Sequence, residues 1–331
     1  MSNEQASTGR LQRDGFVVRK ERLYGYLIAA CAVVTILVTV GIVLSLSGRA
    51  LTFWTAVSPV DFFTGTEWSP KVNDTYGVLP LISGTLIVTG GSALIALPIG
   101  LAAAVYLSEY ASSRARSILK PSLEILAGVP TVIYGYMALV YITPLFQGFL
   151  PLSVQLLPSG LPLVPEFTLV FPALRTFNAL SASIVVGIMI IPMVSSISED
   201  ALSAVPDSLR EAGYGIGSTK FDVSTRIVVP SATSGIIASY VLALSRAIGE
   251  TMAVTMAMGM SPQMPYFPNV LRNLAESGQT ITAAMVQIAG ADSLGGVTYE
   301  AMFALGMTLF VVTLTMNVLA ELVRRRFREV Y

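Results

Sequence analysis

Six long apolar runs constrain the fold of this 331-residue chain more than any other feature. They cover about residues 24–46, 79–107, 123–146, 177–198, 232–259 and 302–323. A helix of about 20 apolar residues crosses the hydrocarbon core of a bilayer. Charged residues make up only 12% of the chain, whereas roughly a quarter is usual in soluble domains. The sequence therefore predicts an all-α polytopic membrane protein with about six transmembrane helices.

The third run is interrupted by Gly128-Val129-Pro130 in the middle of apolar sequence. Membrane proteins tolerate such helix breaks where neighbouring groups satisfy the freed backbone carbonyls. We expect a broken helix or a loop buried in protein at this position. Residues 271–288, before the sixth run, have apolar side chains at roughly helical spacing. This spacing predicts a short external or re-entrant helix.

Basic residues are divided unequally between alternate segments of the chain. Fifteen lie in the two tails and in the second and fourth connections between runs, against four in the other three connections. By the positive-inside rule the fifteen are cytoplasmic, so both termini are predicted to be cytoplasmic in a multi-pass protein of the cell membrane. The predicted order is a cytoplasmic tail (1–23), an uncleaved first span (24–46), an external segment (47–78), a transmembrane domain (79–323) and a basic cytoplasmic tail (324–331).

Composition excludes several kinds of chemistry. The chain has no histidine and one cysteine, Cys31, inside the first run, which removes histidine metal sites, histidine-based catalysis and disulfides. No Gly-Lys pair is present, so there is no phosphate loop of the kind that binds ATP. A net charge of zero argues against a nucleic-acid partner. We expect no catalytic residue, no metal and no cofactor in this chain, and membrane lipid around it.

Arg246 and Glu250 lie inside the fifth run. An arginine near the centre of a bilayer costs about 2.5–3.5 kcal/mol on insertion scales and normally faces protein or water. Residues four apart share one face of a helix and can pair, so one interpretation is an internal ion pair that fixes packing. The other is that Arg246 meets an anion in a transport path, since a guanidinium offers paired donors to phosphate or carboxylate oxygens. Glu250 would then hold Arg246 while the site is empty, or accept a proton from the substrate.

Small hydroxyl residues and acids form two further groups of candidates. The hydroxyls of Ser83, Thr85 and Thr131 could line the path, although such residues equally serve helix packing in lipid. Four acids lie near the predicted cytoplasmic ends of spans and are expected to be solvated or helix-terminal charges: Glu109, Glu124, Glu199 and Asp200. The adjacent pair 199–200 should point to different helix faces, which disfavours a metal site there.

The connection at residues 211–230 carries the most specific pattern, EAGYGIGSTKFDVSTRIVVP. It predicts a short amphipathic helix, a glycine turn and a second short element stopped by proline, which would make a rigid knob suited to docking into a partner. The alternative from the pattern alone is an ordinary connecting loop. The pattern resembles the EAA loop of ATP-binding-cassette importer permeases, which reads E-A-A, three residues, G, nine residues, I, one residue, L-P. The matching positions are Glu211, Ala212, Gly217, Ile227 and Pro230, with Gly213 and Val229 as departures. The resemblance implies a coupling helix that inserts into a separate ATPase subunit.

Several other segments resemble the PstC family of phosphate-specific permeases. They are SRAIGETMAV at 245–254, GTEWSP at 65–70, YGVLPLISGTL at 76–86, EILAGVPTVIYG at 124–135, TITAAM at 280–285 and Asn317. This resemblance implies a MetI-like type I importer permease in which Arg246 and Glu250 are the ionisable pair of the phosphate path. It also implies a PstA-like sister permease, two PstB-like ATPase subunits that bind ATP and magnesium, and a PstS-like phosphate-binding protein outside.

Three alternatives stand beside this interpretation. A permease for another oxyanion, such as molybdate or sulfate, would differ only in site detail. A self-contained carrier driven by an ion gradient commonly shows inverted repeats and several acids at mid-membrane, whereas this sequence shows no clear repeat and one intramembrane acid. A membrane enzyme would need a nucleophile–base set or metal ligands within its spans, and the composition supplies neither.

Overall fold

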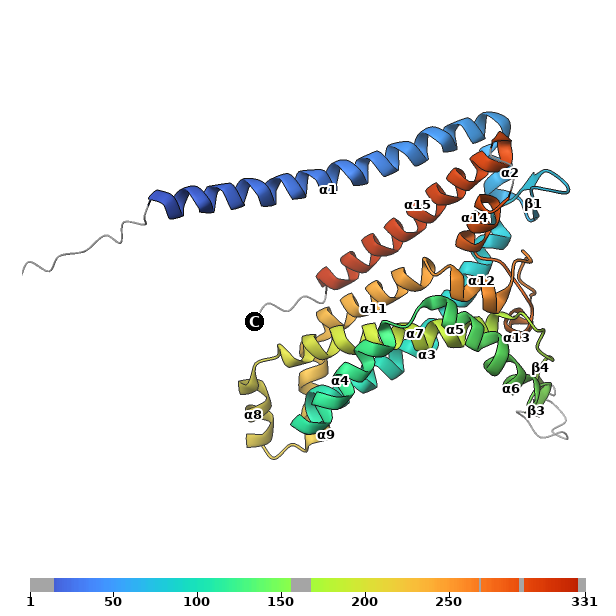
Figure 1. The fold of residues 1–331 in the computed structure, drawn as a ribbon. Helices are drawn as coiled ribbons and strands as arrows, with labels where there is room; N and C mark the ends of the chain where they lie inside the picture. The colour runs from blue at the N-terminus through green and yellow to red at the C-terminus, as the bar shows by residue number, and fades with distance from the viewer. Residues whose placement is uncertain (1–14, 156–167, 268, 292–294, 327–331) are drawn as a thin grey trace, which may run out of the picture.

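Helices dominate the computed structural model, which describes residues 15–155, 168–267, 269–291 and 295–326 (Figure 1). The first half contains α1 (Gly15–Ala56), α2 (Pro59–Thr64), α3 (Leu79–Val105), α4 (Ser113–Ala127), α5 (Thr131–Met137) and α6 (Thr143–Gln147). The second half contains α7 (Ala179–Ser203), α8 (Asp207–Gly215), α9 (Lys220–Val223), α10 (Val229–Ser231), α11 (Thr233–Ile248), α12 (Met252–Met258), α13 (Val270–Ala275), α14 (Ile281–Ala289) and α15 (Gly296–Arg326). Three π-helical turns extend helices: η1 (Tyr106–Tyr110), η2 (Ala138–Ile142) and η3 (Ser224–Val228).

The long helices agree with the apolar runs. Within the described residues, four helices are long and apolar enough to cross a membrane: Lys20–Ala56, Leu79–Tyr110, Ala179–Ser203 and Gly296–Leu322. Two further helix pairs pass the same test but are bent: Ser113–Ala127 with Thr131–Gln147 by 89°, and Lys220–Ser231 with Thr233–Ile248 by 70°. Counting each bent pair as one span gives up to six, which matches the number predicted from the sequence.

The third and fifth runs both contain breaks. The break predicted at Gly128-Val129-Pro130 is confirmed, and the Tyr134 hydroxyl donates to the carbonyl of Leu126 beside it at 2.8 Å. The fifth run was expected to be one helix over 232–259, which is wrong, because α11 ends at Ile248 and α12 begins at Met252. The region 271–288 contains two short helices, α13 and α14, rather than one.

The centre of the bundle is the pair α3 and α7, which pack along their length. Glycines set how closely they approach, as small residues do in membrane bundles. A Cβ added at Gly100 would lie 2.7 Å from the Val194 side chain, and one at Gly187 would lie 3.2 Å from that of Ile95. α1 contacts α15, while residues 20–42 are exposed on this chain.

The two ends of the bundle differ (Figure 1). One end carries α8 and α9, and α1 begins and α15 ends on that side. The other carries two antiparallel hairpins, β1 (Trp68–Ser69) with β2 (Thr75–Tyr76) and β3 (Leu152–Gln155) with β4 (Thr168–Phe171). These strands lie outside the spans, so the prediction of a helical membrane fold holds.

Candidate substrate path and coupling loop

The segment 211–230 forms the predicted knob, made of α8, a glycine turn and α9. Gly217 has φ +85°, a left-handed conformation that glycine adopts without steric cost. The Gly217 N–H donates to the carbonyl of Tyr214 at 2.9 Å, and the Ser218 N–H to that of Gly213 at 3.2 Å. The second element, Lys220–Ser231, ends one residue after Pro230 and is bent by 70° from the helix that follows, which agrees with the proline stop predicted from the sequence.

The interior of the knob depends on Gly213, which is buried. A Cβ added there would lie 2.7 Å from Ile227 Cδ1 and 2.9 Å from Val223 Cγ2, so α8 and the second element are in direct contact. Glu211 and Ala212, the other residues of the motif, are exposed. Three exposed apolar side chains lie nearby: Tyr214, Ile216 and Phe221.

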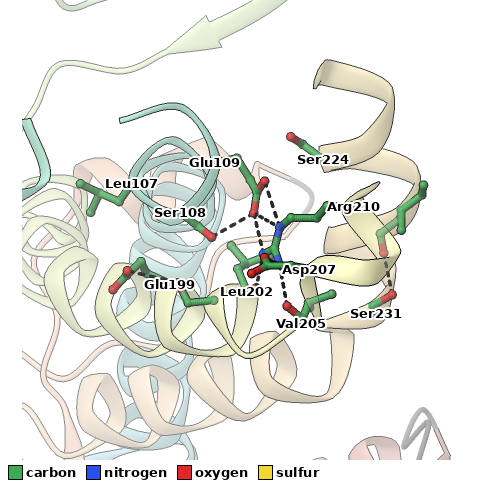
Figure 2. Close-up of polar contacts among 12 residues, drawn as sticks. Leu107, Ser108, Glu109, Glu199, Leu202, Val205, Asp207, Arg210, Ser224 and Ser231 are labelled. Atoms are coloured by element: carbon green, nitrogen blue, oxygen red, sulfur yellow. Dashed lines mark hydrogen bonds and ion pairs between the residues drawn. The ribbon is translucent and has the colours of Figure 1, made fainter. Parts of the chain in front are cut away.

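Arg210, one residue before the motif, anchors α8 to the membrane helices (Figure 2). Its side chain is 15% exposed and its Nη2 lies 3.0 Å from Oε1 of Glu109, whose side chain is 5% exposed. Nη2 also donates to the carbonyl of Leu202 at 2.9 Å, and Nη1 to that of Val205 at 2.5 Å. On the solvent side, Nη1 lies 3.1 Å from Oδ1 of Asp207.

A second group of charges connects α4 to α7. Glu199 is 4% exposed at its side chain and is contacted by Arg116 at 3.1 Å and Lys120 at 2.5 Å. Lys120 also lies 3.2 Å from Asp200, whose side chain is 67% exposed, so the two adjacent acids differ in burial although one ammonium group contacts both. Glu109 and Glu199 lie near the ends of their helices, as expected for helix-terminal charges. They are not solvated, because both side chains are buried and paired with basic residues distant in sequence. In the described ranges no group of histidine, cysteine or acidic residues could hold a metal ion.

Arg246 and Glu250 do not form an ion pair, which was one of the two interpretations of the sequence. The pairing assumed a continuous helix, and α11 ends at Ile248 between them. Arg246 is exposed on this chain and makes no hydrogen bond or ion pair within the part of the chain that the structure describes. Glu250 is buried, with 8% exposed, and its Oε1 accepts from the Ala253 N–H at 3.2 Å. It therefore caps the start of α12.

The start of α14 joins α3 to the break after α11. The Ile281 N–H donates to the Thr85 hydroxyl at 3.2 Å, and the Thr282 hydroxyl donates to the carbonyl of Glu250 at 2.9 Å. Both threonines are buried. Thr85 and Glu250 therefore both contact the start of α14, at residues 281–282. The sequence pattern did not indicate that these two candidates lie near the same segment.

The other two hydroxyl candidates differ in their environment. The Ser83 hydroxyl donates to the carbonyl of Pro80 at 2.8 Å and lies 3.4 Å from that of Gln263. Thr131 is half-buried at the start of α5, and its hydroxyl makes no hydrogen bond among the residues described. Of the three candidates, Thr131 alone keeps a hydroxyl that is not engaged with another described residue.

In the part of the chain that the structure describes, four long apolar helices and two bent helix pairs, with an anchored knob at one end, are the fold of a multi-pass helical membrane protein. Residues 96–329 match the sequence model of the family described as "Binding-protein-dependent transport system inner membrane component". The chain belongs to this family. It is a transport subunit of an ATP-binding-cassette importer and not an enzyme, and such a permease works with ATPase and binding-protein partners.

Relatives and solved structures agree with this assignment. "Phosphate transport system permease protein PstC" of Haemophilus influenzae is 34% identical over 81% of this chain and 82% of its own length. The protein of the same name in Xylella fastidiosa is 36% identical over 81% and 79%. "Probable ABC transporter permease protein YqgH" of Bacillus subtilis is 32% identical over 87% and 85%. A bacterial alginate ABC transporter in complex with its periplasmic protein has a similar fold, with a TM-score of 0.60 at 16% identity over 93% of this chain and 96% of that one. The inward-facing MetNI methionine transporter gives 0.51 at 15% over 76% and 95%.

Proposed function

We propose that this chain is one half of the membrane pore of an ATP-driven importer for inorganic phosphate, delivered by an extracytoplasmic binding protein. The observation that carries the proposal is the similarity to proteins named PstC, at 34–36% identity over about four-fifths of both lengths. The segment SRAIGETMAV, which contains Arg246 and Glu250 and resembles the PstC family, has the clearest anion chemistry in the sequence.

Arg246 is the group that would meet phosphate. Its guanidinium is exposed on the single chain and is not neutralised by Glu250, so it is available to a substrate or to the sister subunit. Charge-assisted, bidentate bonds from a guanidinium to phosphate oxygens are among the strong hydrogen bonds in proteins. The helix break at 249–251 and the hydroxyl of Thr131 would line the same path. Ser83 and Thr85 support it through packing.

The knob would dock into the ATPase, which places it in the cytoplasm. The positive-inside rule gives the same orientation, and the ends of α1 and α15 lie on the side of α8 (Figure 1), so both termini would be cytoplasmic. ATP and magnesium would be bound by two PstB-like ATPase subunits. A PstA-like sister permease would complete the pore, and a PstS-like binding protein would dock on the opposite side, which carries the hairpins.

The test is uptake of labelled phosphate into vesicles that contain the complete complex, with ATP and a competent binding protein. Arg246→Gln should abolish uptake while the complex still assembles, and Arg246→Lys should retain part of it because the charge remains. Arg325→Gln is the matched control, since it removes an exposed arginine of α15. Wild-type uptake in Arg246→Gln would remove Arg246 from the path. Failure of the wild-type complex to take up phosphate, with uptake of molybdate or sulfate instead, would contradict the proposed substrate.

A further inference from the structure

The contact between α8 and the end of α3 is buried, charged and made across 101 residues of sequence. We infer that Glu109 and Arg210 form the joint through which movement of the knob is transmitted to the membrane helices. The inference rests on the proposed docking of the knob into an ATPase. It assigns to two residues outside the 211–230 motif a positioning role in coupling ATP hydrolysis to transport.

Glu109 belongs to η1, which continues α3 without interruption, since Leu79–Tyr110 is one apolar helix. Its side chain and that of Arg210 are 5% and 15% exposed. Removing one partner of a buried ion pair leaves an uncompensated charge and is strongly destabilising. The contact therefore resists separation, and a displacement of α8 is carried to η1 and α3 rather than absorbed by sliding.

The same guanidinium also holds the end of α7. Leu202 and Val205, whose carbonyls accept from Arg210 at 2.9 and 2.5 Å, lie in and just beyond the last turn of α7. Carbonyls at a helix C-terminus lack partners within the helix, and a cation satisfies them favourably. The Arg210 side chain thus contacts the ends of both central helices, α3 (through η1) and α7 (Figure 2).

η1 is contacted from two further directions. Lys220 of α9 lies over the ring of Tyr110, 5.1 Å from its centroid, which is a second contact between the knob and η1. Arg116 of α4 donates to the carbonyl of Leu107 at 3.1 Å and pairs with Glu199 of α7. η1 is therefore the point where α8, α9 and α4 meet the end of α3.

From α4 the contacts lead to the substrate path. α4 is followed, after the break at 128–130, by α5, which packs against α12. The approach is close, because a Cβ added at Gly135 would lie 3.0 Å from the Cα of Ala253. The Ala253 N–H is the donor that holds Glu250. A chain of direct contacts thus joins the knob to the break beside Arg246, and we expect movement of the knob to be transmitted along it.

The measurement is the ratio of labelled phosphate taken up to ATP hydrolysed, in vesicles that contain the full complex. Glu109→Gln and Arg210→Gln should each lower this ratio by about tenfold, within the range in which one site typically affects another, while ATP hydrolysis continues. The double variant should be no worse than the poorer single variant, because both changes remove the same contact. Arg325→Gln breaks the exposed pair with Glu321 of α15 and should leave the ratio unchanged.

A covalent cross-link between residues 109 and 210 distinguishes a contact that transmits movement from one that only stabilises the fold. In a Cys31→Ser background, Glu109→Cys with Arg210→Cys should be uncoupled, and a short bifunctional thiol reagent should restore the ratio without restoring any charge. A wild-type ratio in both glutamine variants would overturn the joint, and so would a low ratio that persists after complete cross-linking. Failure of the wild-type complex to import phosphate in the same assay would instead contradict the proposed function.

Discussion

The N–H of Ile281 donates to the buried hydroxyl of Thr85 at 3.2 Å and thereby fixes the start of α14 against α3. The same hydroxyl donates to the carbonyl of Leu81, one helical turn earlier, at 2.8 Å. Both of its bonds are made within the protein. Thr85 was a candidate for lining the substrate path, and this geometry supports its alternative role in packing.

Replacement of Thr85 by valine should therefore destabilise the fold rather than weaken substrate binding. Valine keeps the shape but leaves the Ile281 N–H without an acceptor, which costs about 1–3 kcal/mol when the donor is buried. Thermal unfolding of the purified complex measures the loss, and Thr85→Ser, which retains the hydroxyl, is the control. A stable Thr85→Val complex with weakened phosphate affinity would show that the hydroxyl contacts substrate.

Gly84, the preceding residue of α3, allows the same close approach. A Cβ added there would lie 2.3 Å from the backbone oxygen of Gln279, which cannot move like the end of a flexible side chain. Gly84→Ala should destabilise the chain by about 1–3 kcal/mol through overpacking. Gly90→Ala on the same helix meets nothing within 4 Å and should be neutral or slightly stabilising. Equal thermal midpoints for the two variants would show that α3 and residue 279 are farther apart.

The knob offers a second matched pair of glycines. Gly217 has φ +85° and Gly215 does not, although a Cβ at either position would meet no atom within 4 Å. Gly217→Ala should cost about 1–2 kcal/mol, because an L-residue is strained in this conformation. The strain should displace the knob and lower phosphate-stimulated ATP hydrolysis. Gly215→Ala should match the wild type, and an unaffected Gly217→Ala complex would argue against docking through this turn.

Local features of this structure were predictable from sequence, whereas contacts between distant segments were not. The lengths of the apolar runs predicted the transmembrane spans, and Gly128-Val129-Pro130 predicted the helix break before α5. Both features depend only on residues that are neighbours in the sequence. The ion pair between Arg246 and Glu250, one of the two interpretations of the sequence, does not form, because a spacing of four places residues on one face only in a continuous helix. A helix end at Ile248 could have been suspected from Gly249, since glycine is common just past helix ends.

The buried charges show the limit of sequence reasoning most clearly. Glu109 and Glu199 resemble end-of-span charges in sequence, and nothing local distinguishes them from the exposed Glu124 and Asp200. Their partners, Arg210 and the basic residues of α4, are supplied by the packing of helices far apart in the chain. Acidic and basic residues that are predicted to lie at the same edge of the membrane are candidates for ion pairs. Comparing their predicted positions could have indicated these contacts.

Two replacements of Glu250 distinguish a structural role from an electrostatic one. Glutamine removes the charge but keeps an acceptor oxygen, whereas alanine removes both. Its Oε1 accepts from the Ala253 N–H at 3.2 Å, and the amide oxygen of glutamine can accept the same bond. Glu250→Gln should therefore unfold within about 0.5 kcal/mol of the wild type, while Glu250→Ala loses the cap and about 1 kcal/mol. If the carboxylate accepts a proton from phosphate during transport, Glu250→Gln lowers the uptake rate although the fold is intact, which is the result we expect. Thermal unfolding and labelled uptake of both variants decide the matter, since wild-type uptake in Glu250→Gln would leave the side chain with its capping role alone.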